Sequence, residues 1–180
     1  GWGGGKTTLV ANVYKSERKK FERHAWISIS QTYKVDDLLR RMIEELHENE
    51  KVDKIPIDIR GSNHKRLVET IRSSLDKKRY LIILDDVWDP TAFNAISDAI
   101  NVDDNNGSRI IITTRSSDVA SLAHDGRKLE LKVLESTEKW DLFCKRAFQN
   151  EEDRKCPKEL EELGDKIVSK CQGLPLAPDL

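Results

Sequence analysis

The sequence has few residues of the kinds that anchor a chain in a membrane or cross-link it. Aromatic residues make up 6% of its 180 residues, and there are only three cysteines. No apolar run approaches the ~20 residues that a membrane-spanning helix needs, so we expect no transmembrane segment. The chain opens on glycines rather than on the charged and apolar regions of a signal peptide.

The cysteines and histidines show no spacing that predicts a disulfide or a metal site. Cys144, Cys156 and Cys171 are odd in number, lie far apart and form no CxxC pair. Free thiols in a reducing cytosol are therefore the better interpretation. The four histidines are scattered without the short spacing of zinc ligands, so we expect no zinc centre.

Neither sign of charge is in excess. There are 31 Lys and Arg residues against 32 Asp and Glu residues, and the net charge is −1. This balance provides no field that would attract nucleic acid or an anionic membrane. The length suffices for one domain with a substantial core and the start of a second.

The beginning of the chain suggests a segment of a longer protein. Gly1 stands inside a motif, and Met42 is the only methionine. We therefore expect a parent protein, to which every functional expectation below refers.

Four short apolar runs predict buried parallel strands. Two of them, Tyr80–Leu84 and Arg109–Thr113, are nearly continuous in Ile and Leu, a pattern typical of strands covered by helices on both faces. The others are Ala25–Ile29 and Leu129–Val133. Helical spacing of apolar residues separates them, most clearly at Val35, Leu38, Leu39, Met42, Ile43 and Leu46. The alternation predicts an α/β fold with a doubly wound parallel sheet.

The pattern changes after residue 134, and we expect residues 1–134 and 135–180 to form different domains. Two helices without a strand between them predict the start of a small helical subdomain in the second. Ser136 or Thr137 can cap the first helix, and Pro157 suits the first turn of the second. The second helix is expected to end at Gly173. Its inward face is expected to consist of Leu160, Leu163, Ile167, Val168 and Cys171.

The clearest chemistry stands at the beginning of the chain, which reads GWGGGKTT. Glycines let backbone N–H groups converge on a phosphate, and the N-terminus of the following helix adds partial positive charge. Lys6 is expected to bind the phosphates of ATP or ADP, contacting the β-phosphate and, in ATP, the γ-phosphate, and the Thr7 hydroxyl to bind Mg²⁺. The expected nucleotide-binding residues of this P-loop are Gly3, Gly4, Gly5, Lys6, Thr7 and Thr8.

This P-loop is shorter than usual. The motif has a glycine, four residues and then Gly-Lys-Thr, whereas only three residues separate Gly1 from Gly5. Either one residue is missing or the first glycine lies upstream. The strand that feeds such a loop is also absent, so we expect a sheet whose first strand is truncated. The helix after the loop is expected to bury Leu9, Val10, Val13 and Tyr14.

Two of the predicted strands end in polar residues. LIIL is followed by Asp85 and Asp86, and IIITT by Arg115. Because the carboxyl ends of parallel strands meet at one edge of the sheet, we expect Asp85 to hold Mg²⁺ and Asp86 to orient or deprotonate a water. Arg115 is expected to contact the γ-phosphate; taken alone, it could equally be a solvated arginine.

These motifs together resemble one family, the NB-ARC domain of plant intracellular disease-resistance receptors of the nucleotide-binding leucine-rich-repeat class. The resemblance covers nearly the whole chain in order. It rests on GWGGGKTT, which is similar to GxGGxGKTT, and on FERHAWISISQ, LIILDDVWD, GSRIIITTR, LKVLESTEKWDLF and GLPLA. Trp88 after the acid pair is typical of the coiled-coil branch, whereas the Toll-like branch usually has Asp there.

The resemblance implies an ADP/ATP-binding switch in which ADP holds a resting state, exchange for ATP favours an open, oligomerising state, and slow hydrolysis resets it. Carried over, it assigns Lys6 and Thr7 to phosphate and Mg²⁺, Asp85 to the metal and Asp86 to hydrolysis. It also implies that Arg115 meets the γ-phosphate, and that Pro175 of GLPLA packs near the adenine, although Pro178 interrupts the helix expected after that motif.

The resemblance also implies the surroundings of the domain. The parent protein would be cytoplasmic, with flanking coiled-coil and leucine-rich-repeat regions and a homo-oligomeric active state, and any membrane association would come from those other regions. Two alternatives stay open: a general P-loop ATPase or phosphotransferase, for which the sequence shows no separate acceptor motif, and a non-functional fragment with a defective P-loop.

Overall fold

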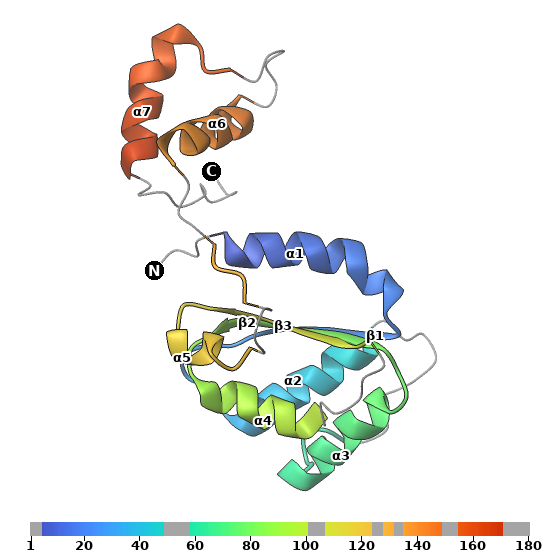
Figure 1. Ribbon diagram of the computed structural model, residues 1–180. Coiled ribbons are helices and arrows are strands. Elements are labelled where there is room, and N and C mark those ends of the chain that lie inside the picture. The colour runs from blue at the N-terminus through green and yellow to red at the C-terminus, as the bar shows by residue number, and fades with distance from the viewer. Residues whose placement is uncertain are drawn as a thin grey trace. The chain divides into compact units, whose positions relative to one another are not determined.

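The computed structural model describes residues 5–48, 58–100, 107–123, 128–131, 135–148 and 155–170 (Figure 1). They divide into a larger compact unit, which spans Thr7–Lys128, and a smaller one that contains the residues up to Lys6 and those from Leu129 onward. In these ranges, no helix combines the length and the apolar character needed to cross a membrane.

The larger unit is built on a parallel sheet of three strands in the order β1-β2-β3. The strands run over Arg23–Ser28, Tyr80–Val87 and Arg109–Thr114. β2 is the middle strand, and every residue in it except Asp86 is buried. Its apolar run is therefore continuous for the reason expected, because helices cover both faces. Three of the four predicted strands are confirmed.

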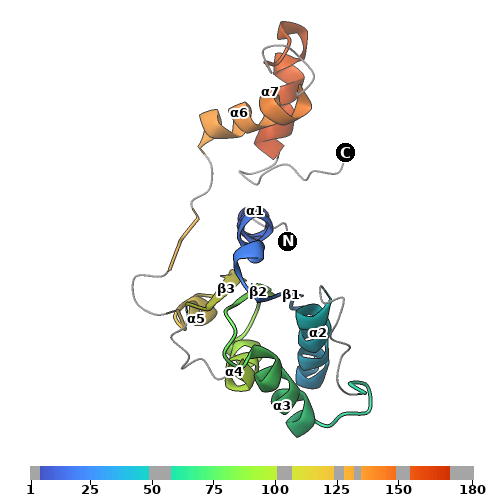
Figure 2. The same cartoon turned by 90° about the vertical axis from the view of Figure 1, so that its right-hand side faces the viewer.

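Helices lie on both faces of the sheet (Figures 1 and 2). One face carries α1 (Lys6–Glu17), which continues into the short 3-10 helix η1 (Arg18–Lys20). The opposite face carries α2 (Val35–His47), α3 (His64–Leu75) and α4 (Pro90–Ile100), and the short α5 (Ser117–Ala120) follows β3. This is the predicted α/β architecture.

The hydrophobic core lies between the sheet and the three helices α2, α3 and α4. The predicted apolar stripe of α2 is buried, at Leu38, Leu39, Met42, Ile43 and Leu46. These side chains belong to one cluster with the apolar residues of β1, β2, α3 and α4. Asn63, the residue before α3, caps the helix: its side chain accepts from the backbone N–H of Arg66 at 3.0 Å.

The first helix, α1, differs from the expectation that it buries an apolar face. None of its residues is buried, and Leu9 and Val13 are 42% and 39% exposed. Its contact with β1 runs through Tyr14, whose hydroxyl lies 2.9 Å from His24 Nδ1 and whose ring meets the Trp26 ring edge-on. Because α1 shares its face of the sheet with no other long helix of the described ranges, its flanks have no neighbour to pack against.

The prediction of a fourth strand at Leu129–Val133 is wrong for the residues that the structure describes. Leu129, Glu130 and Leu131 are not in a strand, and Leu129 is 74% exposed; Lys132 and Val133 lie outside the described residues. The run alternates apolar and charged residues, and it has no stretch of consecutive apolar residues such as those of β2 and β3. It therefore has little to bury by joining a sheet.

The smaller unit contains α6 (Ser136–Ala147), the 3-10 helix η2 (Lys158–Leu160) and α7 (Glu161–Lys170). Its core comprises Phe143, Cys144 and Val168, with Trp140 packed against them. A Cβ at Gly164 would stand 2.8 Å from the Phe143 ring and 2.9 Å from the Trp140 ring. The glycine thus permits the close packing of the two helices.

Two expectations for these helices are corrected. The cap of α6 is Glu135 rather than Ser136 or Thr137, and the Glu138 side chain accepts from the Glu135 backbone N–H at 2.8 Å. In α7 the predicted inward face is mostly exposed, because a single partner helix covers only a narrow stripe that includes Val168. The exposed members are Leu160 in η2 and Leu163 and Ile167 in α7; Cys171 and Gly173 lie outside the described residues.

The contact between α1 and β1 predicts a pH dependence of stability. Burial, and then the charge of Arg18, lower the pKa of His24 from its ordinary value of 6.5. The unfolded chain therefore binds more protons than the folded chain below that value, so the free energy of unfolding should fall as the pH falls.

We expect the urea midpoint to drop between about pH 7 and about pH 5.5, and to drop less in His24→Gln, which keeps a polar partner for Tyr14. Urea unfolding followed by circular dichroism measures how the midpoint of each protein changes with pH. An equal drop of the midpoint in the two proteins would contradict this role of His24.

Candidate functional site

Three side chains from different elements meet at the carboxyl end of β2. Thr7, in the first turn of α1, donates from Oγ1 to Asp85 Oδ1 at 2.8 Å. Thr113 near the end of β3 donates to the same oxygen at 2.6 Å. Asp85 and Thr113 are only 6% and 5% exposed. Two hydroxyls thus bind one buried carboxylate oxygen, and they tie α1 and β3 to β2.

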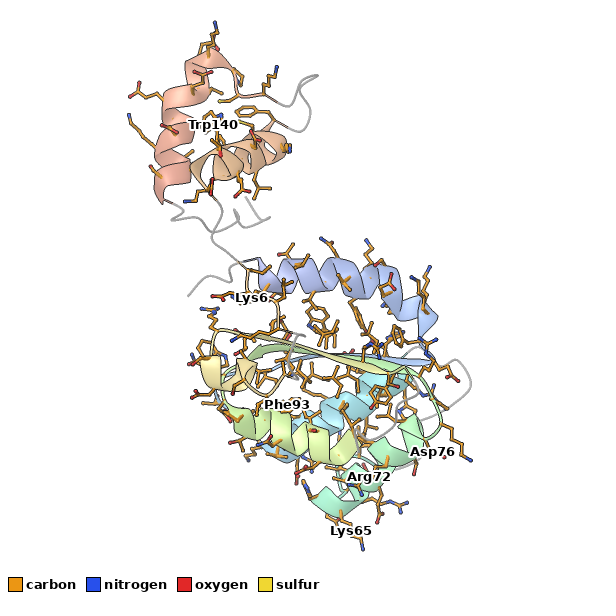
Figure 3. All side chains as sticks on the ribbon, viewed as in Figure 1. Lys6, Lys65, Arg72, Asp76, Phe93 and Trp140 are labelled. Atoms are coloured by element: carbon orange, nitrogen blue, oxygen red, sulfur yellow. The ribbon has the colours of Figure 1, made fainter. Side chains whose placement is uncertain are left out.

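The start of α1 is arranged to present backbone N–H groups. Gly5 has a φ of 75°, in the left-handed region that glycine adopts without a steric penalty. Lys6 begins the helix (Figure 3) and Thr8 is exposed in its first turn. That turn contains no acidic residue, so its partial positive charge is not neutralised by its own side chains. Gly3 and Gly4 lie outside the described residues.

The acid pair sits on a β-bulge. Leu84 pairs with Ile112 and Val87 with Thr114, so three steps along β2 match two along β3 and one residue is extra. Asp86 has a φ of 58°, in the left-handed region that Asp tolerates better than most residues. A bulge re-aims side chains, and here the Asp86 side chain is 41% exposed whereas Asp85 is buried.

Thr113 is a site residue that the sequence analysis missed. Its hydroxyl donates to Asp85 Oδ1 and accepts from the backbone N–H of Asp86 at 2.9 Å. It therefore holds both members of the acid pair at once. The signal was present in the sequence, because a threonine ends a run of isoleucines where β3 reaches the same edge as Asp85, but our interpretation of that run considered only Arg115.

Arg115 follows β3 and reaches the same edge. Its Nη2 lies 3.8 Å from Asp86 Oδ1, and its guanidinium carbon lies over the Trp88 ring, 5.4 Å from the centroid. The preceding residue fixes the backbone there, because Thr114 Oγ1 donates to the carbonyl of Val87 at 2.6 Å. Thr7, Asp85, Asp86 and Arg115 are thus brought together as predicted from the strand ends, whereas Pro175 lies outside the described residues.

The segment after β2 is also held in place, by a pair that the sequence did not reveal. The Tyr33 hydroxyl lies 3.1 Å from Asp89 Oδ1, and Asp89 Oδ1 also accepts from the Thr91 N–H at 2.8 Å. Burial acts to raise the pKa of Asp89, but the hydrogen bonds from Thr91 and Tyr33 outweigh it and lower that pKa. Burial and the neighbouring Asp89 raise the pKa of Tyr33.

The donor set at this edge fits Mg²⁺. The Thr7 hydroxyl and the Asp85 carboxylate are hard oxygen donors that already lie 2.8 Å apart. No group of three or more His, Cys, Asp or Glu in the described ranges could hold a metal ion. Mg²⁺ bound together with phosphates does not need such a group, because it typically uses one or two protein ligands and keeps several waters.

Comparison with known proteins shows extensive similarity to plant resistance proteins. The chain is 40% identical over 179 residues to "Disease resistance protein RPM1" of Arabidopsis thaliana, with 97% of this chain and 19% of that protein covered. It is 37% identical over 183 residues to "Disease resistance protein RPP13" of the same species, covering 98% and 21%. With a putative late blight resistance protein homolog of Solanum demissum it shares 34% over 177 residues, covering 96% and 13%.

The chain thus spans about a fifth of the length of the two Arabidopsis relatives. The family described as "NB-ARC domain" matches residues 1–153, which include α1, the three strands of the sheet and α6. The resemblance inferred from the motifs is therefore confirmed, and the chain belongs to the NB-ARC domain family.

Proposed function

We propose that this chain is the nucleotide-binding part of an ADP/ATP-dependent switch in a plant immune receptor, with slow ATP hydrolysis as the reset. The observation that carries the proposal is the hydrogen bond from Thr7 to Asp85. It joins the first turn of the helix that follows the glycine run to the acid at the end of the buried middle strand. A phosphate-binding helix start and a metal-binding carboxylate are needed at the same place for this function.

Binding is assigned to the residues around the start of α1. Lys6 supplies a full positive charge to the β- and γ-phosphates, and Thr8 and the glycines Gly3, Gly4 and Gly5 supply backbone and hydroxyl donors. Thr7 and Asp85 would hold Mg²⁺, which when bound neutralises phosphate charge. Pro175 is proposed to pack near the adenine.

Hydrolysis is assigned to Asp86 and Arg115. The carboxylate of Asp86 accepts a proton from a water whose oxygen forms a bond to the γ-phosphorus. The bond from that phosphorus to the β–γ bridging oxygen breaks, and the electron pair leaves with ADP. Arg115 neutralises charge on the γ-phosphate oxygens during this step. The exposure of Asp86 leaves its carboxylate accessible to water.

The switch requires a difference in affinity. ATP can shift the conformation only if it binds the open state better than ADP does. We propose that residues 1–134 hold the nucleotide and that residues 135–180 begin the helical subdomain that moves relative to them. The relatives' names, which refer to disease resistance, support a role in defence. In an intracellular parent protein, coiled-coil and leucine-rich-repeat regions and a homo-oligomeric active state would complete the receptor.

The first prediction from the proposed function concerns Lys6. We expect Lys6→Ala to abolish ADP binding by the parent protein, because each charge-assisted hydrogen bond to a phosphate is worth about 1.5–3 kcal/mol. Isothermal titration calorimetry measures the affinity. Lys15→Ala, in the last turn of the same helix, is the matched control and should bind normally. If the unmodified protein also failed to bind ADP, the switch proposal would be refuted.

The second prediction concerns Asp86. Asp86→Ala should still bind ATP but hydrolyse it about 100-fold more slowly, the scale of a lost general base. Phosphate release from a single turnover measures the rate. Asp98→Ala, an exposed acid on α4, should be unaffected. An unchanged rate in Asp86→Ala would remove Asp86 from the mechanism.

The third prediction concerns Thr113. Thr113→Val should destabilise the protein by about 1–3 kcal/mol, because the Asp86 N–H loses its acceptor in a partly buried place. It should also weaken the dependence of ATP affinity on magnesium, since Asp85 loses one of its two hydroxyl donors. Thr113→Ser should restore both properties. Urea unfolding and ATP titrations with and without magnesium test the two effects, and a serine variant as impaired as the valine variant would argue against them.

A further inference from the structure

Trp88 is an aromatic residue with an exposed ring at the edge where the acid pair and Arg115 meet. It is 38% exposed, and it is not among the residues of the hydrophobic core. Single exposed apolar side chains are common on protein surfaces, so the exposure of this ring by itself indicates no role. Its contact with the Arg115 guanidinium is therefore the more informative feature.

The guanidinium of Arg115 is contacted from two different directions. Trp88 lies against its face, with the guanidinium carbon 5.4 Å from the ring centroid. Asp86 lies toward its edge, where Nη2 is 3.8 Å from Oδ1. The face of a guanidinium stacks on aromatic rings, whereas its edge carries the N–H groups that bind carboxylates and phosphates. The two contacts therefore have different consequences for an incoming anion.

The edge contact between Arg115 and Asp86 is loose. A separation of 3.8 Å is longer than a hydrogen bond, and both side chains are exposed to solvent, by 36% for Arg115 and 41% for Asp86. Pairs of this kind contribute little to stability. A phosphate group, with more charge and more acceptor oxygens than a carboxylate, would replace Asp86 at that edge without displacing the ring.

The residues on both sides of Trp88 are held by hydrogen bonds. Before it, the carbonyl of Val87 accepts from Thr114 Oγ1. After it, Asp89 is bound by the Tyr33 hydroxyl and by the Thr91 N–H at the start of α4. Trp88 is thus placed on a short backbone segment that is anchored at β3, at α4 and at Tyr33. A support fixed in this way reduces the rotamer freedom that Arg115 would lose on binding an anion.

We propose that Trp88 is a positioning residue that sets the preference of this site for a nucleoside triphosphate over a diphosphate. It supports the Arg115 guanidinium by its face, and N–H groups at the guanidinium edge bind the terminal phosphate in place of Asp86. The inference rests on the proposed function, in which Arg115 meets the γ-phosphate. Because a diphosphate has no such group, the ring contributes to the binding of the triphosphate alone.

The test compares affinities of the parent protein for ADP and for a non-hydrolysable ATP analogue by isothermal titration calorimetry. Trp88→Leu should weaken binding of the analogue about two- to fivefold, the scale of an exposed cation–π contact, and leave ADP binding unchanged. Trp88→Phe, which keeps a ring face, should lose less. Phe93→Leu on α4 (Figure 3) is the matched aromatic control and should change neither affinity.

A double-mutant cycle separates positioning from packing. In an Arg115→Gln background, Trp88→Leu should have no further effect on the affinity for the analogue, because the supported group is gone. Equal weakening of ADP and analogue binding by Trp88→Leu, or full additivity with Arg115→Gln, would overturn the inference while the proposed function stands. Absence of ADP binding by the unmodified protein would overturn both. Circular dichroism checks the fold of each variant, and Trp88→Phe keeps the test decisive if Trp88→Leu does not fold.

Discussion

The structure of the site depends on one buried carboxylate. Asp85 Oδ1 accepts hydrogen bonds from Thr7 and from Thr113, and so a single oxygen joins α1, β2 and β3. A buried carboxylate is costly unless it is hydrogen-bonded, which makes the positions of the two hydroxyls a condition of the fold. The same hydroxyl of Thr113 also binds the Asp86 backbone, and the bulge at the acid pair is thereby coupled to the buried carboxylate.

The bulge gives two adjacent acids different environments. Asp85 is buried and bound by hydroxyls, whereas Asp86 has a left-handed backbone and an exposed carboxylate near Arg115. A regular strand would place consecutive side chains on opposite faces of the sheet, and one of the acids would then be among the helices. The extra residue on β2 keeps both near the carboxyl edge, where Arg115 and Trp88 also lie. The proposed proton transfer and metal binding can in this way be assigned to neighbouring residues.

Much of the fold was predictable because its signals are local. The continuous apolar run of β2 and the helical stripe of α2 each depend on burial of a whole face, and both are confirmed. The errors concern apolar helix faces, whose burial depends on whether another element packs against them. Leu9 and Val13 in α1, and Leu163 in α7, are apolar at helical spacing and yet exposed, because periodicity identifies the apolar side of a helix but not whether a neighbouring element covers it.

For the site, the sequence by itself determined the chemical groups and their order: a glycine run with Lys6 and Thr7, an acid pair after one strand and Arg115 after another. It also indicated that the acid pair and Arg115 meet, because parallel strands bring their carboxyl ends to one edge. Only the tertiary structure decided which contacts each group makes and how exposed it is. The role of Thr113 between the two acids, the bulge at Asp86 and the stacking of Trp88 on Arg115 all arise from the register of β2 against β3, and pairing between strands far apart in the sequence is not encoded in either strand alone.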